Sequence, residues 1–165
     1  MTLADHARML IEYNEHANIR VLDMALALDD AVLDATAGAS FGSIRGNVQH
    51  VLTAQVNWLS RWTQQPPPAY DLPSRDGLRA AYEASHAALR LFAAPLTDGD
   101  WDRVVEYKDS AGAPYAMPLG VLITHVVNHG TLHRGEAGML LAAHGRSPGD
   151  IDFVYFVRDR GARGQ

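Results

Sequence analysis

The chain has 165 residues, which is long enough for one domain with its own hydrophobic core. It has no cysteine, and this excludes disulfides, thiolate nucleophiles and sulfur-ligated metals. With 14 basic and 19 acidic residues its net charge is -5, so we expect no nucleic-acid partner and no binding to an anionic membrane.

The two ends of the sequence are polar. The first residues are too polar for a signal peptide, and no apolar run approaches the roughly 20 residues of a membrane span. Together with the lack of cysteine, this is compatible with a cytoplasmic protein. We expect one domain over residues 1–165, with a flexible tail at 158–165, where arginines alternate with aspartate and glycine.

Two amphipathic helices are predicted in the first half of the chain. Apolar residues recur at intervals of three and four over residues 3–28. The stretch 29–39 ends this helix, and Ser43 is suited to cap a second helix over about residues 43–63. The three prolines at 66–68 must stop that second helix, because proline lacks an amide donor.

Two more long helices follow, separated by a different pattern. The third begins near Ser74 and ends before Pro95. Between residues 101 and 117, β-favouring residues on both sides of Gly112 predict a hairpin or another extended segment. The last long helix covers about residues 118–144, with Gly145 after its end. The expected fold class is therefore all-α, a four-helix bundle with a long crossover between its third and fourth helices.

The last long helix carries the most informative motif. His125, His129 and His133 are four residues apart, so they share one face and adjacent pairs can bind one metal ion. They interrupt an apolar stripe, where a polar group without a partner is costly. The spacing does not choose between the pair 125/129 and the pair 129/133. His50, on the inner edge of the second helix, is the best candidate for a ligand from another helix.

The alternative is that these histidines are core residues whose ring nitrogens are satisfied by hydrogen bonds. A single histidine would favour that interpretation. Three at helical spacing, with a fourth on another helix, favour a metal site.

The run NHGTLHRGE at residues 128–136 resembles the NHxxxHRGQ signature of the DinB/YfiT-like proteins, a bacterial family of damage-inducible four-helix bundles. Residues 13–18 are similar to the family's YNxWAN start, and residues 41–50 to its approach to the ligand in the second helix. The likeness covers about residues 8–157. It implies a divalent metal held by His50, His129 and His133.

The same resemblance implies a function. The wider superfamily includes thiol-dependent transferases and a mycothiol-dependent isomerase. We therefore expect a metal-dependent enzyme with an open coordination position, acting on a small molecule as an S-transferase with a low-molecular-weight thiol as co-substrate. The alternatives are a metal-dependent hydrolase and a non-catalytic, metal-containing stress-response bundle. Many relatives are homodimers, so a homodimer is expected. Imidazole ligands suit zinc or nickel best here, and also accept iron, cobalt, copper or manganese.

The sequence does not identify a catalytic residue, but three residues are candidates for acting beside the ligands. His16 stands where the family usually has tryptophan, and Glu136 where it usually has glutamine. Glu136 falls near the 129/133 pair on a helical wheel, so it could orient a ligand or accept a proton, or it could be a solvated or arginine-paired acid. His125 lies one turn before that pair and is expected to line the pocket or to touch a ligand.

Other polar residues receive weaker assignments. Arg134 could bind an anionic substrate or pair with a structural acid. His6, His86 and His144 fall near helix ends or surfaces and are assigned no role.

Overall fold

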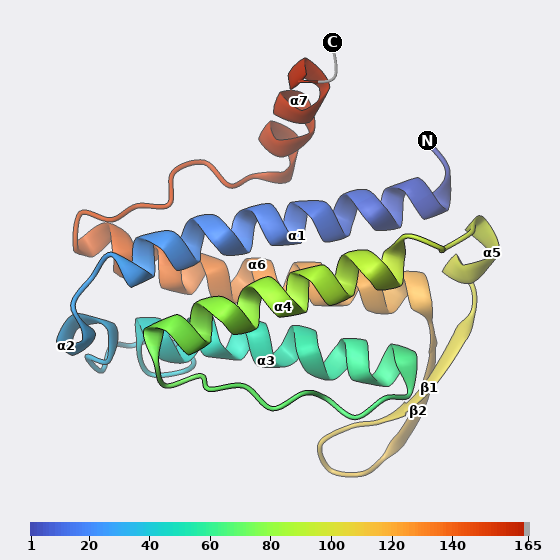
Figure 1. The fold of residues 1–165 in the computed structure, drawn as a ribbon, viewed down its shortest axis with the longest axis horizontal. Helices are drawn as coiled ribbons and strands as arrows, with labels where there is room; N and C mark the ends of the chain where they lie inside the picture. The colour runs from blue at the N-terminus through green and yellow to red at the C-terminus, as the bar shows by residue number, and fades with distance from the viewer. Residues whose placement is uncertain (164–165) are drawn as a thin grey trace.

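A computed structural model describes residues 1–163 of the chain, and it is an all-α helical bundle, as predicted (Figure 1). Four long helices run side by side, and three shorter helices and one hairpin complete the described part. The long helices are α1 (Leu3–Leu26), α3 (Ile44–Thr63), α4 (Arg75–Ala93) and α6 (Leu119–Ala143). The short helices are α2 (Asp30–Leu33), α5 (Asp98–Trp101) and α7 (Phe153–Arg163).

The crossover between α4 and α6 contains the expected hairpin. Strand β1 (Val104–Lys108) pairs antiparallel with β2 (Pro114–Pro118), with Val104 opposite Pro118. Asp109 fixes the turn, since its Oδ1 accepts the backbone N–H groups of Ala111 and Ala113 at 2.9 Å each. The hairpin lies beyond one end of α3 and α6 (Figure 1).

Side-chain caps explain where the long helices begin. The hydroxyls of Thr2, Ser43 and Ser74 each accept a backbone N–H from the first turn of the helix that follows. The caps at Ser43 and Ser74 are the two expected from the sequence. At its other end α3 stops at Thr63, and its cap residue Gln64, whose φ of 56° is left-handed, lies two residues before the first proline.

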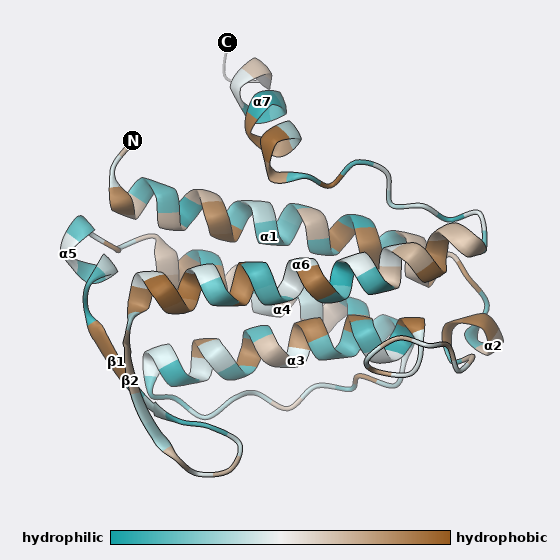
Figure 2. Ribbon diagram, turned by 180° about the vertical axis from the view of Figure 1, so that it is seen from behind, coloured by the Kyte–Doolittle hydropathy of each residue, from teal (hydrophilic) through white to brown (hydrophobic). Residues whose placement is uncertain are grey.

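The hydrophobic core lies between the four long helices, and α6 packs between α1 and α3. Leu22, Leu52, Leu119 and Leu141 are fully buried, and each comes from a helix of this group. Hydrophobic residues are interrupted by polar ones along α6, which lies in front of α4 when the bundle is seen from behind (Figure 2). The polar interruptions belong to the candidate site described below.

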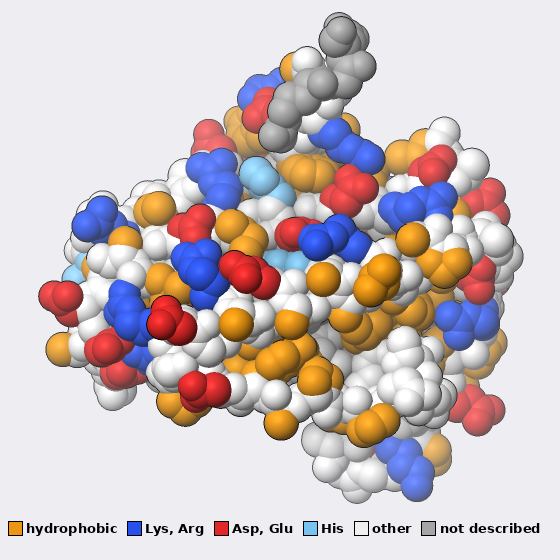
Figure 3. All heavy atoms as spheres, in the orientation of Figure 1, with side chains coloured by type: hydrophobic (Ala, Val, Ile, Leu, Met, Phe, Trp, Pro, Cys, Tyr) orange, Lys and Arg blue, Asp and Glu red, His pale blue; other side chains and the backbone are white. Residues whose placement is uncertain are grey.

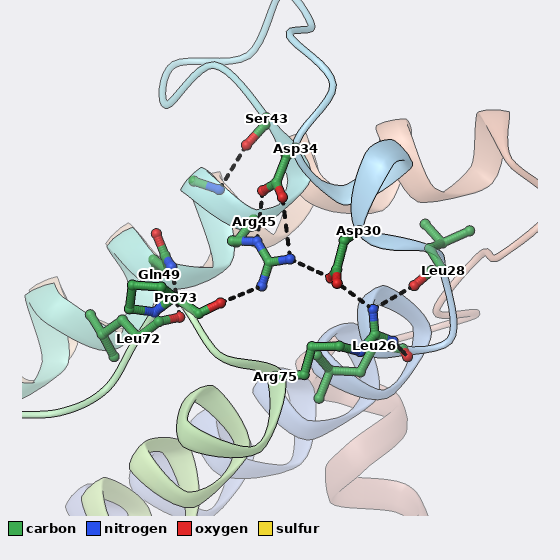
Figure 4. Close-up of polar contacts among 11 residues, drawn as sticks. Leu26, Leu28, Asp30, Asp34, Ser43, Arg45, Gln49, Leu72, Pro73 and Arg75 are labelled. Atoms are coloured by element: carbon green, nitrogen blue, oxygen red, sulfur yellow. Dashed lines mark hydrogen bonds and ion pairs between the residues drawn. The ribbon is translucent and has the colours of Figure 1, made fainter.

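An ionic clamp fixes the segment between α1 and α3 (Figure 4). Arg45, which is 9% exposed, donates from Nε to Asp34 and from Nη2 to Asp30, both at 2.6 Å. Its Nη1 donates to the Pro73 carbonyl at 3.1 Å, and Arg75 donates to Asp30 at 3.0 Å. The clamp therefore ties α2 and the loop after α3 to the start of α3 and α4.

Helix α7 points away from the bundle but contacts α1 through several of its side chains (Figure 1). Phe156 is buried, with its ring centroid 5.8 Å from that of Tyr13. Arg160 forms an ion pair with Glu12 of α1 at 3.0 Å. Residues 158–163, assigned from the sequence to a flexible tail, are helical, and the rest of that tail lies outside the described residues.

Charges are mixed on the surface. Figure 3 shows basic and acidic side chains interspersed over the face seen in Figure 1. Of the helices within residues 1–163, none combines the length and the apolar run needed to cross a bilayer.

Candidate metal centre

Helices α3 and α6 bring three imidazoles to one point. His50 comes from α3, and His129 and His133 come from successive turns of α6. One ring nitrogen from each lies within 4.8 Å of the others, and the Nε2 atoms of His50 and His129 are 2.9 Å apart. Nitrogen donors converging from two helices form a group that could hold a divalent transition metal.

The structure selects one of the two pairs that spacing left open. The converging group contains His129 and His133, and it does not contain His125. The exposed ring of His125 stacks on that of His129, with centroids 5.7 Å apart, and meets Trp58 at 5.2 Å. His125 therefore lies beside the candidate ligands, on the side that faces the hairpin.

The surroundings keep two of these rings, those of His50 and His129, neutral near pH 7. Burial, together with the nearby His133 and His129, lowers the pKa of His50 to about 4. Burial, together with the nearby His133 and His125, lowers the pKa of His129 as well. A neutral imidazole has a free lone pair, which a metal requires.

Glu136 holds the third ring in a defined orientation. Its Oε2 lies 3.0 Å from Nδ1 of His133, which leaves Nε2 of that ring as the nitrogen for ligation. Ser40 donates a hydrogen bond to the other carboxylate oxygen. Both bonds lower the pKa of Glu136, and the bond from Ser40 has the larger effect. The carboxylate is therefore ionised near neutral pH.

A loop between α2 and α3 covers the group. The ring of Phe41 stacks on that of His50, with centroids 3.5 Å apart and an interplanar angle of 14°. The loop can approach α3 because residue 46 is glycine: a Cβ there would stand 2.0 Å from the Phe41 carbonyl oxygen. Sequence reasoning did not assign a role to Ser40 or Phe41, because nothing local shows that this loop folds back.

Behind the imidazoles lies a buried polar network centred on Arg134, the largest fully buried side chain. Its Nη1 donates to the Oδ1 atoms of Asn14 and Asn18 at 2.8 Å each. Gln55 accepts from Asn14 at 2.6 Å and donates to Ser85 at 2.7 Å. Arg134 thus binds neutral amides in the core, rather than the substrate or structural acid expected from the sequence.

Two other histidines are placed away from the group of three. His16 lies on α1 beside Phe156, with ring centroids 5.4 Å apart. His86, assigned from the sequence to a helix end or surface, is only 2% exposed, and its Nε2 lies 3.2 Å from Nδ2 of Asn18. That expectation for His86 was wrong, because α4 turns this residue toward α1.

Comparison with known proteins identifies related sequences. The sequence model of the DinB family matches residues 3–162. Protein DinB of Bacillus subtilis (strain 168) is 21% identical over 164 residues, which cover 94% of this chain and 95% of the relative.

Proposed function

Since the chain belongs to the DinB family, we propose that His50, His129 and His133 bind one divalent transition metal. The observation that carries this proposal is the convergence of three ring nitrogens from two helices within 4.8 Å. Zinc or nickel suits such a set of neutral imidazoles best, and iron, cobalt, copper and manganese are the other candidates.

We further propose that the protein is a thiol-dependent S-transferase for a small-molecule substrate. A metal with three protein ligands and one open position lowers the pKa of a bound thiol or water and polarises an electrophile. The chain itself has no cysteine, so the thiol has to arrive as a co-substrate.

The surrounding residues have distinct tasks in this proposal. Glu136 keeps the proton of His133 on Nδ1 and its Nε2 free. Phe41 shields the His50 ring from water on one side. His125, exposed and stacked on His129, is in position to contact a bound substrate or to exchange a proton with it.

The test compares the purified protein with its His129→Ala and His144→Ala variants. Metal analysis should show about one ion per chain in the wild type and in His144→Ala, which changes an exposed histidine, and almost none in His129→Ala. Full retention of the metal by His129→Ala would reject this ligand.

The same proteins are then screened with bacterial thiols and electrophilic acceptors. Thiol transfer that is lost in His129→Ala supports the transferase. Ester or amide hydrolysis without any thiol requirement would identify a metal-dependent hydrolase instead. A metal-loaded protein that turns over no substrate would favour the non-catalytic stress-response bundle.

A homodimer is also proposed, and the outer face of α6 supports it. Val121, Leu132 and Met139 are 51%, 60% and 67% exposed and lie on one face of the helix. Leu132→Glu should shift the protein from dimer to monomer in light scattering, whereas Leu91→Glu on α4, which is 76% exposed, should not. A cytoplasmic location and a single-domain organisation stay predictions from the sequence.

A further inference from the structure

A cleft beside the hairpin has no role in the function proposed so far. Its volume is about 380 Å³, which is within the range of small-molecule pockets. Residues of α3, of both hairpin strands and of the hairpin turn line it: Trp58, Arg61, Tyr107, Asp109, Ser110 and Tyr115.

Aromatic rings form the walls of this hairpin cleft. The rings of Trp58 and Tyr107 meet edge to face, with centroids 5.0 Å apart. Tyr115 stacks on Tyr107 at 5.8 Å. Such walls favour a flat, unsaturated ligand, because rings pack against one another over large areas at little conformational cost.

One cationic side chain, that of Arg61, lines the cleft. The guanidinium carbon of Arg61 lies 4.6 Å from the centroid of Trp58 and 5.5 Å from that of Tyr107. Within residues 1–163, Arg61 forms no ion pair, so its donors remain available to a ligand. The planar fork of an arginine matches a carboxylate.

Asp109 limits the charge that the cleft accepts. One oxygen of its carboxylate is bound to the turn amides, but the negative charge stays at the cleft. A monoanionic carboxylate can be balanced by Arg61 beside this acid. A dianionic phosphate would face the same acid with one cation to balance it, and is therefore disfavoured.

The cleft is connected to the candidate metal centre by side chains. Trp58, which lines the cleft, contacts His125, and His125 stacks on His129. From His50 to Arg61 the α3 axis rises on the order of 15 Å. A ligand held at Arg61 and extended along Trp58 therefore points toward the three histidines.

We propose that the hairpin cleft binds the carboxylate end of an elongated organic acid with a flat, unsaturated body. Arg61 binds the carboxylate, and Trp58 and Tyr107 contact the flat part. The identification of this acid as the substrate rests on the proposed function, whereas its binding in the cleft does not.

The test uses 2-naphthoate as the probe and the zinc-loaded, full-length protein. Binding is followed by NMR on the indole N–H of Trp58, assigned with a Trp58→Phe variant. Trp62 is buried and Trp101 packs against Gly120, so their indole signals serve as internal references. We expect the Trp58 signal to shift with 2-naphthoate and the affinity to fall roughly 10-fold in Arg61→Gln.

Matched controls separate charge from shape. The neutral analogue 2-naphthamide should bind the wild type about as weakly as 2-naphthoate binds Arg61→Gln. Arg103 lies directly before β1, pairs with Asp100 and is outside the cleft, so Arg103→Gln should bind 2-naphthoate like the wild type.

Several results would overturn the proposal. These are an unchanged affinity in Arg61→Gln, equal binding of 2-naphthamide, tighter binding of 1-naphthyl phosphate, and no shift of the Trp58 signal at any concentration. Metal content is measured on the same samples. If the wild type binds 2-naphthoate through Arg61 but holds no metal, the proposed function is rejected and the proposed cleft is supported. If the protein holds a metal but its binding of 2-naphthoate does not depend on Arg61, the proposed cleft is rejected and the proposed metal site is supported.

Discussion

The Nδ1 atom of His133 lies 3.0 Å from the Oε2 atom of Glu136, one turn further along α6. Because Nδ1 is bound to the carboxylate, Nε2 is the nitrogen of His133 that is left to face His50 and His129. A glutamine oxygen could accept the same N–H, whereas an alanine could not.

Glu136→Ala should therefore weaken metal binding by roughly 10- to 100-fold, and Glu136→Gln by only a few-fold. The affinities are measured by competition with a chromophoric chelator. Glu83→Ala, at an exposed position of α4, is the control and should bind metal like the wild type. Wild-type affinity in Glu136→Ala would show that the contact does not orient the ring.

Removing the metal should lower the thermal stability of the protein. A ligand that binds only the folded state at about 100 times its dissociation constant adds about 2.7 kcal/mol, which corresponds to roughly 5–10 °C in Tm for a chain of this size. Calorimetry with and without a chelator measures the change. The shift should be absent in His129→Ala and present in His125→Ala, and a shift of equal size in both variants would contradict the proposed ligand set.

Gly46→Ala should displace the loop that carries Phe41. Alanine favours a helix, but its Cβ would stand 2.0 Å from the Phe41 carbonyl oxygen, so the loop has to move away from His50. We expect faster amide hydrogen exchange in residues 39–43 and weaker metal binding. Gly135→Ala in α6 is the matched control, because nothing lies within 4 Å of its Cβ. Unchanged exchange in Gly46→Ala would contradict the close approach.

Replacing Arg134 by methionine should destabilise the fold by roughly 2–4 kcal/mol. The side-chain oxygens of Asn14 and Asn18 would lose a charged donor inside the core. The free energy of unfolding is measured in urea on the metal-free protein. Arg158→Met, at a position whose side chain is 67% exposed, should change it by less than about 0.5 kcal/mol. A variant at position 134 that is as stable as the wild type would show that the network is dispensable.

His86 should make the stability depend on pH. Burial lowers its pKa to about 4, whereas in the unfolded chain it is about 6.5. Between these values the unfolded state binds the extra proton, so the contribution is fully present above pH 6.5 and is lost as the pH falls toward 4.

The loss amounts to roughly 1 kcal/mol per pH unit within that window. Other groups titrate there too, among them His50, so the difference between the wild type and His86→Gln isolates this residue. Urea titrations of the metal-free proteins from pH 7 to pH 4 should show a shallower decline in the variant. Parallel declines would mean that His86 is not the group responsible.

Much of the secondary structure could be predicted because its signals are local. The caps at Ser43 and Ser74, the prolines at 66–68 and the helical periodicity set the four long helices within about two residues of their observed ends. The short helices α2, α5 and α7 were not predicted. They are held by contacts with distant segments, such as that of Phe156 with Tyr13, which no local pattern contains.

The candidate metal centre was predicted in part. Helical spacing placed His129 and His133 on one face, but it did not distinguish them from His125. The family resemblance implied the set that converges in the structure, and the assignment as metal ligands stays a prediction. The polar network centred on Arg134 escaped prediction, because the two asparagine acceptors lie 116 and 120 residues away in the sequence.

By itself, the sequence determined that the chain forms long amphipathic helices, contains no sulfur ligand from cysteine, and carries imidazoles one turn apart on one helix face. These properties depend on composition and on neighbours within a few residues. Only the tertiary structure decided that His50 of α3 meets the 129/133 pair, that Arg134 is buried among amides, and that Trp58 and Arg61 face the hairpin. Such contacts depend on how separate helices pack, and packing is decided by the sum of many weak interactions between residues far apart in the chain.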